Sequence, residues 1–247
     1  MQNATLVALS GQVALRRKLD VIANNVANMD TAGFKRVSLD LEEAKMPKAS
    51  ATLFQRRDRD NRFVRELATV HDFSAGSVEM TGNDLDVAIE GEKGFFAVQT
   101  PGGERYTRAG DFAIDSTGRL VTADGNPVLG DGGVITFGAE ETNVAIAEDG
   151  TISSSAGLKG KLRVVEFADE NALQKEGDNL YASSAAPQVP AIVRVRQGAL
   201  EKSNVSGVQE LTAMLDVQRA YERITNMVKQ QNDLSARAIE RLGSATA

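Results

Sequence analysis

The chain has 247 residues, of which 42% are hydrophobic and 25% charged, and its formal net charge is -6. This length can bury a sizeable core, but the negative charge and the scattered aromatic residues offer neither a basic field nor a stacking platform to nucleic acid. There is no cysteine and only one histidine, His71, so disulfides are excluded and the usual zinc ligands and Cys or His nucleophiles are missing. We therefore expect no nucleic-acid partner, no small-molecule substrate, no metal, no cofactor and no catalytic residues.

The N-terminal segment has the spacing of an amphipathic helix, which we expect over residues 4–30. Apolar side chains at steps of three and four residues lie on one face of such a helix. This main stripe consists of Ala8, Leu15, Leu19, Ile22, Val26 and Met29. A second group, Leu6, Leu9 and Val13, lies roughly opposite, which is typical of a helix that contacts more than one neighbour.

The same segment lacks the order of a cleaved export signal. The basic residues Arg16, Arg17 and Lys18 follow the apolar stretch instead of preceding it, which is the reverse of a Sec-type signal peptide. No apolar run in the chain approaches the roughly 18 residues that are needed to cross a bilayer. We expect a protein that does not span a membrane and that either is soluble or leaves the cytoplasm by a route without cleavage.

Residues 24–36, NNVANMDTAGFKR, mark the end of the helix. Gly33 can adopt the left-handed conformation that closes a helix. Asp30 and Thr31 compete for backbone hydrogen bonds, and Phe34 begins extended chain. The segment therefore predicts a sharp helix stop.

Three amide side chains, those of Asn24, Asn25 and Asn28, crowd the side of the helix away from the main stripe. Uncharged amides can donate and accept hydrogen bonds with adjacent backbones without the desolvation cost of an ion. They can equally belong to a frayed, solvated helix end. Both interpretations remain open at this point.

Residues 35–77 are interpreted as a linking arm. Val37, Leu39 and Leu41 alternate like a strand, and a run of mixed charge follows over residues 56–62. Neighbouring opposite charges cancel each other's field, so this run favours a solvated surface over a binding patch.

Residues 78–199 are predicted to form the central β domain, because short alternating runs are separated by turn residues. The expected strands are 85–89, 95–99 as its return strand, 112–114, 120–122, 134–137, 144–147, 162–167 and 192–195. Gly118, Gly125 and Gly150 supply the positive φ that tight reversals need. We expect a mostly antiparallel sandwich or a partly closed barrel.

The C-terminal segment, 200–247, returns to helical spacing over residues 206–243. Its apolar stripe consists of Met214, Val217, Tyr221, Ile224, Val228, Ala238 and Leu242. Leu211, Leu215 and Met227 lie off this stripe. At 1.5 Å per residue the two terminal helices would be roughly 40 and 55 Å long.

The two terminal helices need each other or another molecule, because most helical stability comes from a buried apolar face. The predicted fold class is α+β, with residues 1–34 and 200–247 paired as a coiled-coil-like stalk beside the β domain. Pairing the two helices would cover the main stripe of each. It would leave exposed the apolar residues outside the stripes, Leu6, Leu9, Val13, Leu211, Leu215 and Met227. We therefore expect the helices to be partly disordered in a free monomer and ordered when subunits stack, although an ordinary intramolecular helix pair has equal support from periodicity.

The motifs that resemble reactive or ligand-binding sites are weak. The glycine cluster at 130–133 lacks the strand, GxGxxG and helix that dinucleotide binding requires, so a turn is favoured. Asp58 and Asp60 lack the glycine and the distal glutamate of a calcium loop. His71 stands beside Asp72, where a structural hydrogen bond is a better interpretation than catalysis.

Three segments together resemble one protein family. NNVANMDTAGFKR at 24–36 is similar to the signature that closes the N-terminal helix of bacterial flagellar rod and hook proteins. RYTRAGDFAIDSTGRLVTADGNPVLG at 105–130 resembles the central β motif of that family, and LEKSNVSGVQELTAMLDVQRAYE at 200–222 resembles the entry to its C-terminal helix. The three occur in the right order and cover nearly the whole chain, which is far more specific than any single motif.

The resemblance implies a structural subunit of the flagellar basal body, most similar to proteins of the proximal rod. It implies export through the flagellar type III apparatus without cleavage, assembly in the periplasm with copies of itself and other rod proteins, and a role in transmitting torque. Terminal helices would line the tube and the β domain would face outward. A distal-rod or hook-family subunit is the nearest alternative.

The interface expected from these considerations consists of the two apolar stripes and the Asn-rich helix end. Its members are Leu6, Leu9, Val13, Leu15, Leu19, Ile22, Asn24, Asn25, Val26, Asn28, Met29, Met214, Val217, Tyr221, Ile224, Val228 and Leu242. Asp30, Thr31, Gly33 and Phe34 form the helix-end motif. An alternative of another class is a β-sandwich binding module with dimerising helices.

Overall fold

The computed structural model describes residues 2–45 and 62–244, which divide into two compact units. Unit 1 contains residues 1–26, 37–70 and 207–247, and unit 2 contains residues 27–36 and 71–206. The boundaries at 26/27 and 206/207 fall inside the terminal segments of the sequence analysis. Ten residues of the N-terminal signature thus belong to the β unit.

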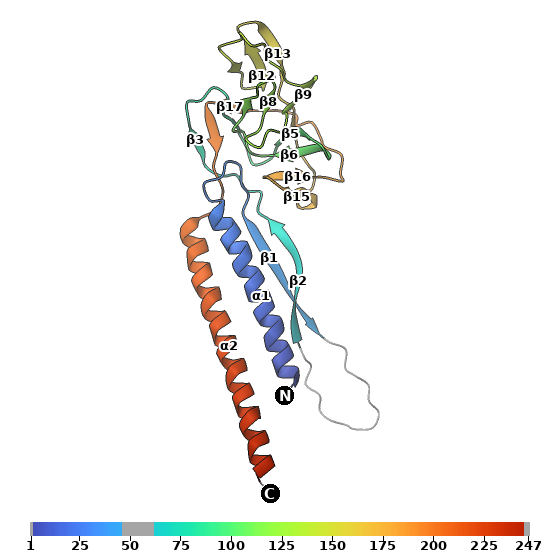
Figure 1. The fold of residues 1–247 in the computed structure, drawn as a ribbon. Coiled ribbons are helices and arrows are strands. Elements are labelled where there is room, and N and C mark those ends of the chain that lie inside the picture. Colours follow the sequence, from blue (N-terminus) through green and yellow to red (C-terminus); the bar gives the residue numbers. More distant parts are fainter. Residues whose placement is uncertain (1, 46–61, 245–247) are drawn as a thin grey trace. The chain divides into compact units, whose positions relative to one another are not determined.

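Unit 1 is built from two long helices and a pair of strands (Figure 1). Helix α1, Gln2–Ala27, and helix α2, Gly207–Ser244, confirm both predicted helices, although α1 ends three residues before the predicted position. The helices lie side by side, and the Gln12 side-chain amide donates to the Thr225 hydroxyl at 2.9 Å. On the main stripes, Ala8, Ile22 and Val217 are buried, so amphipathic spacing placed these apolar faces inside.

The segment interpreted as a linking arm contains the two strands of unit 1. Strand β1, Val37–Lys45, pairs with β2, Arg62–His71, in a two-stranded sheet whose strands run in opposite directions (Figure 1). The predicted alternation appears in β1, where Val37 is buried and Asp40 is exposed. The mixed-charge run lies outside the described residues except for Arg62, where β2 begins.

Unit 2 confirms the expected mostly antiparallel β domain and with it the α+β class. Its largest sheet has the order β14-β5-β6-β16-β15, and each of its neighbouring strand pairs is antiparallel. The strands are β14 Val164–Val165, β5 Phe95–Thr100, β6 Gly103–Thr107, β16 Leu180–Ala182 and β15 Gln174–Gly177. This sheet is open at β14 and β15, so within the described residues the sheets do not close into a barrel.

Smaller antiparallel sheets complete unit 2. One has three strands, β11 Ala145–Ile146, β12 Thr151–Ser154 and β13 Gly157–Lys161. Four have two strands: β7 Ala113–Ile114 with β8 Leu120–Val121, β9 Leu129–Gly130 with β10 Gly133–Val134, β4 Val87–Ile89 with β17 Val195–Gln197, and β3 Val78–Met80 with β18 Ala199–Glu201. A 3-10 helix, η1, spans Glu170–Ala172.

One predicted strand pairing is wrong. The run 95–99 is not the return strand of 85–89, because β4 pairs with β17, with Val195 opposite Ile89, while β5 pairs with β6 and β14. The intervening residues 91–94 do turn, but the carbonyls of Gly91 and Gly94 accept hydrogen bonds from Arg108. The turn therefore does not connect two paired strands; its carbonyls bind the side chain of Arg108.

Two buried clusters form the core of unit 2. The larger is mainly aliphatic and includes Val87, Val98, Val128 and Ile152, each with no exposed surface. The second is richer in aromatic residues and is called the aromatic cluster after Phe73, Phe95, Tyr106, Phe167 and Tyr181. Its rings meet edge to face at centroid distances of 4.8 to 6.0 Å, the arrangement that aromatic quadrupoles prefer.

The helix-end loop packs tightly within unit 2. Gly33 has φ 64°, as the sequence predicts, and its N–H donates to the Glu201 carbonyl at 2.7 Å. A Cβ at this position would lie 2.4 Å from both Ala109 N and Arg108 C. Glycine is thus required here both for its backbone conformation and for the close approach of another segment.

We expect Gly33→Ala to lower the free energy of unfolding by about 2–5 kcal/mol, because backbone strain and a clash with backbone atoms add together. The matched control is Gly82→Ala, since Gly82 has φ 76° but nothing within 4 Å of its Cβ position, and it should cost about 1 kcal/mol. Urea denaturation followed by circular dichroism measures both. Equal losses would show that the close approach at Gly33 contributes nothing.

Candidate functional site

Three segments that are distant in sequence meet at the carboxylate of Glu201 in unit 2. The Lys35 ammonium donates to Glu201 Oε1 at 2.7 Å, and the Arg108 guanidinium Nε donates to Oε2. The side chains of all three are at most 2% exposed. We call Lys35, Arg108 and Glu201 the Glu201 cluster.

Backbone groups supply further hydrogen-bond partners to the Glu201 cluster. Gly76 N–H donates to Glu201 Oε1 at 2.9 Å, and Lys35 donates to the Ser74 carbonyl at 2.8 Å. Arg108 also donates to the carbonyls of Gly91 and Gly94. Buried charges are tolerated when they are paired and hydrogen-bonded, and each charged side-chain atom of this cluster has at least one partner.

The electrostatics keep the carboxylate ionised. Burial alone would raise the pKa of the Glu201 carboxyl, but the nearby Arg108 and Lys35 cations outweigh burial and hold that pKa below its ordinary value of 4.5. The stability that this carboxylate contributes is therefore present above pH 4.5 and is lost as the pH falls through the lowered pKa. Burial lowers the pKa of Lys35, and Glu201 opposes that shift.

Asn204, three residues after Glu201, links the signature loop at Arg36 to residues 72–74. Its Oδ1 accepts from the Arg36 N–H at 2.7 Å, while its Nδ2 donates to the carbonyls of Asp72 at 2.8 Å and Ser74 at 3.1 Å. Because one amide serves as acceptor and donor at once, it links the signature loop to residues 72–74. A residue with only one of these capacities could not replace it.

Asn25 has an equivalent role inside unit 1. Its side chain is 1% exposed, its Oδ1 accepts from Val37 N–H at 3.0 Å, and its Nδ2 donates to the Val37 carbonyl at 2.8 Å and to Glu210 Oε2 at 3.3 Å. The amide therefore fixes the start of β1 against α1. Asn24 is exposed, whereas Asn28 is half-buried and accepts from the Thr31 hydroxyl at 3.2 Å.

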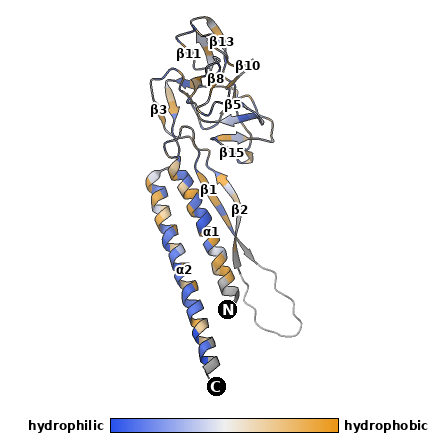
Figure 2. Cartoon of the chain, viewed as in Figure 1, coloured by the Kyte–Doolittle hydropathy of each residue, from blue (hydrophilic) through white to orange (hydrophobic). Residues whose placement is uncertain are grey.

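A mostly apolar hollow lies between α1 and the β1–β2 pair in unit 1. Leu6, Leu9 and Val13 remain 53%, 53% and 55% exposed there, and Leu39, Leu41 and Val64 line the opposite side of a space of about 310 Å³. Figure 2 shows apolar residues on both helices and on both strands of this unit. Three large apolar side chains on one helix face are thus left about half uncovered by the part of the chain that the structure describes.

The other expected interface residues differ widely in exposure. Ile22 and Val217 are buried at 4% and 6%. Leu15, Leu19, Val26, Met214, Ile224 and Val228 are half-buried, and Met29 and Tyr221 are exposed. The side chain of Leu242 lies outside the described residues. In the helix-end motif Gly33 and Phe34 are buried, Asp30 and Thr31 are exposed, and the Lys175 ammonium lies 4.1 Å from the centroid of the Phe34 ring.

Sequence reasoning did not single out the Glu201 cluster or Asn204, although all four residues lie in or beside the quoted motifs. The sequence did offer a clue to their importance, because each of the four is a polar residue inside one of the three family-like segments. Nothing in the spacing, however, indicated which of these residues meet.

Residues 2–45 and 62–244 contain no helix that is both long and apolar enough to cross a bilayer. Nor do three or more of their Asp, Glu and His side chains gather in a way that would hold a metal ion.

Family models match three separate parts of the chain. The model described as flagella basal body rod protein matches residues 6–35, that of the flagellar hook protein FlgE/F/G D1 domain matches 88–154, and that of the flagellar basal body rod FlgEFG protein C-terminal region matches 196–241. Their order is that of the three segments of the sequence analysis.

Curated relatives align along the entire chain. The flagellar basal-body rod protein FlgF of Caulobacter vibrioides is 42% identical over 98% of this chain and 99% of its own length. The chain belongs to the flagellar basal-body rod protein family. This rod protein is also 33% identical to FlgF of Rhizobium meliloti, over 99% of the chain and all of the relative, and 33% identical to FlgG of Bacillus subtilis, over 95% of the chain and 97% of the relative.

Each matched segment of this rod protein supplies one charge of the Glu201 cluster. Lys35 lies in the first segment, Arg108 in the second and Glu201 in the third. The three motifs that identify the family are therefore joined by one buried ionic site in unit 2. Family membership makes the protein a structural rod protein and confirms that it is not an enzyme.

We expect Glu201→Gln to lower the free energy of unfolding by about 3–5 kcal/mol, because it leaves two buried cations without a counter-charge. The matched control is Glu176→Gln, which removes the carboxylate from an ion pair with Arg105 whose side chains are 48% and 18% exposed and should cost less than about 1 kcal/mol. Thermal and urea denaturation of the two variants give the comparison. A loss in Glu201→Gln no larger than in the control would contradict a structural role for the cluster.

Proposed function

We propose that this chain is a subunit of the proximal part of the flagellar rod, where copies assemble helically through their terminal helices and transmit torque. The greater identity to a FlgF protein, 42%, than to the FlgG proteins, near 30%, favours the proximal position. A distal-rod or hook-family position is the alternative. The binding-module alternative has less support, because the family models match both terminal segments as well as the β region.

The main support for assembly through the helices is the exposed apolar surface of unit 1. Leu6, Leu9 and Val13 on α1 and Leu211, Leu215 and Met227 on α2 are each 52–55% exposed. Covering a large apolar side chain completely contributes about 1.5–3 kcal/mol, so covering even half of each favours association. A contiguous apolar patch on a monomer commonly marks an interaction site.

Within this proposal, the half-buried and buried members of the main stripes join α1 and α2 as a coiled-coil-like stalk. Gln12 and Thr225 support side-by-side helices, and Ile224 Cδ1 lies 3.4 Å from the Cβ position of Gly11. Segments 1–34 and 200–247 would form the rod core, and 78–199 the outward domain. That the helices order fully only when subunits stack stays a prediction.

The place of assembly follows from the same family. We infer that the subunit passes through the flagellar type III export apparatus with its N-terminal helix uncleaved, and that it docks in the periplasmic part of the basal body beside copies of itself and other rod proteins. The basic residues after the apolar stretch and the lack of cysteine are compatible with this route. Export through a channel requires an unfolded chain, which marginal lone helices would permit.

We expect Leu9→Asp to leave the fold intact and to abolish rod assembly, because Leu9 is 53% exposed and its new charge would be buried only in the polymer. The free energy of unfolding of the purified variant should fall by only about 1 kcal/mol, because Leu9 is about half-covered in the hollow of its own unit. Swimming in soft agar and electron microscopy of basal bodies provide the functional measurement. Normal motility with intact rods would refute this interface.

Leu158→Asp is the matched control, because Leu158 in β13 of unit 2 is 75% exposed and lies on neither helix. It should leave folding and motility unchanged. Ile22→Asp is a poor test of the interface by comparison, since Ile22 is only 4% exposed and its loss of motility would also follow from unfolding of unit 1.

A further inference from the structure

Residues 71–74 hold the two terminal motifs of unit 2 together through their backbone. Asp72 N–H donates to the Arg36 carbonyl at 2.8 Å. The Asp72 carbonyl accepts from Asn204 Nδ2 at 2.8 Å, and the Ser74 carbonyl accepts from Lys35 at 2.8 Å. Any movement of this short segment would break hydrogen bonds to both the signature loop and the C-terminal motif.

Two side chains of this segment, His71 and Phe73, pack against the aromatic cluster. The Phe73 ring lies 5.4 Å from Tyr181 and 5.7 Å from Phe95, and the His71 ring lies 5.9 Å from Phe73 and 5.7 Å from Tyr181, all between centroids. His71 Nδ1 is buried and has no hydrogen-bond partner within the described residues, and the same holds for the Tyr181 hydroxyl. The only histidine of the chain thus anchors the segment by apolar contact.

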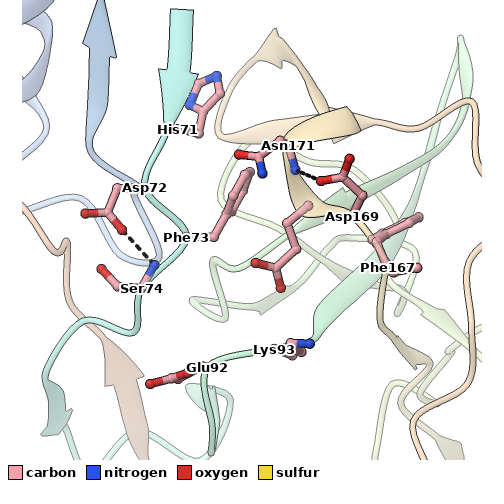
Figure 3. A pocket seen from close by; sticks show the side chains of 11 residues that line it. His71, Asp72, Phe73, Ser74, Glu92, Lys93, Phe167, Asp169 and Asn171 are labelled. Carbon is pink, nitrogen blue, oxygen red and sulfur yellow. Dashed lines mark hydrogen bonds between the residues drawn. The ribbon is translucent and has the colours of Figure 1, made fainter.

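Within the described residues, no hydrogen bond joins His71 Nδ1 to the carboxylates of Asp72, Glu92, Asp169 and Glu170, which line one hollow with it. The Asp72 carboxylate accepts from Ser74 N–H at 3.0 Å, and Asp169 accepts from Asn171 N–H at 3.0 Å (Figure 3). Glu92, Lys93 and Glu170 line the same hollow of about 360 Å³, where burial raises the pKa of Glu170 and favours its neutral form.

Lys175 on β15 is a further positive charge in this region, and its ammonium lies over the Phe34 ring. Burial and then Lys175 lower the pKa of His71. Burial also lowers the pKa of Lys175 itself. A protonated His71 would therefore stand among aromatic rings, near another cation, with an unpaired Nδ1–H.

We propose that His71 is a pH-sensitive latch. The neutral imidazole keeps residues 71–74 packed on the aromatic cluster, and protonation releases this segment together with the loops that it holds, residues 33–36 and 201–204. The inference does not rest on the proposed rod function, because it concerns only groups inside unit 2.

The sign follows from proton linkage. A histidine whose pKa is lower in the closed segment than in the open one binds more protons when open, so closure is most favourable above the ordinary pKa of 6.5 and weakens as the pH falls below it. The weakening ends below the lowered pKa, where closed and open forms are both protonated. Closure is therefore weaker in mild acid than near neutrality.

Nuclear magnetic resonance on the full-length protein tests this directly, since a single histidine gives one titrating imidazole signal. The signal should titrate below 6.5. Hydrogen exchange of the Gly33, Asp72 and Asn204 amides, which donate to Glu201, Arg36 and Phe34, should lose protection in mild acid after correction for intrinsic rates. At a pH below both pKa values, the fold-loss should equal the ratio of the proton dissociation constants of His71 in the closed segment, which the titration gives, and in the open segment, where the ordinary pKa of 6.5 applies.

Three comparisons make the result decisive. His71→Phe keeps an apolar ring and should make the protection of these amides independent of pH between 5.5 and 7.5, while Lys175→Met should move the histidine titration toward 6.5 and reduce the loss. The Ala97 amide in β5, which donates to the Arg163 carbonyl, should keep its protection throughout. A histidine titration at or above 6.5, an equal loss in His71→Phe, or an equal loss at Ala97 would each overturn the proposal.

Discussion

A buried carboxylate bound by two cations is the interaction on which unit 2 depends. Glu201 is 166 residues from Lys35 and 93 residues from Arg108, so its ionic site can form only after both ends of the β unit have come together. A charge without its partner would be costly in this environment, and Gly91, Gly94, Gly76 and Ser74 therefore complete the site through backbone groups. The N-terminal and C-terminal motifs of the rod family are, in this respect, parts of one structure.

Unit 1 is organised by apolar burial on one side of each helix and by polar contacts at selected points. Ile22 and Val217 are covered by the chain itself, and Asn25 fixes the beginning of β1 through a pair of hydrogen bonds to Val37. Leu6, Leu9 and Val13 are not covered. In the assembly that we propose, the inner stripe stabilises the unit, and the outer group is the surface that another copy would cover.

Local patterns were enough to predict the elements whose stability is local or whose periodicity is strong. Both helices, the positive φ of Gly33, Gly118, Gly125 and Gly150, and the antiparallel β region were expected correctly. The errors concern pairing between distant strands, as when β4 joined β17 instead of β5. Short polar strands such as β6 and β15 were also missed, because Arg and Glu side chains conceal an alternation that only their neighbours reveal.

The amino-acid sequence by itself determined the helices, the β region, the lack of cysteine chemistry and the family, because these depend on composition, period and motif order. Tertiary structure alone decided which polar residues of those motifs meet, namely Lys35, Arg108 and Glu201, and which apolar residues stay exposed. It also decided that His71, for which a structural hydrogen bond was expected, has no partner for its Nδ1 among the described residues. The physical reason is that burial and ion pairing are set by segments brought together from far along the chain, and no local pattern carries that information.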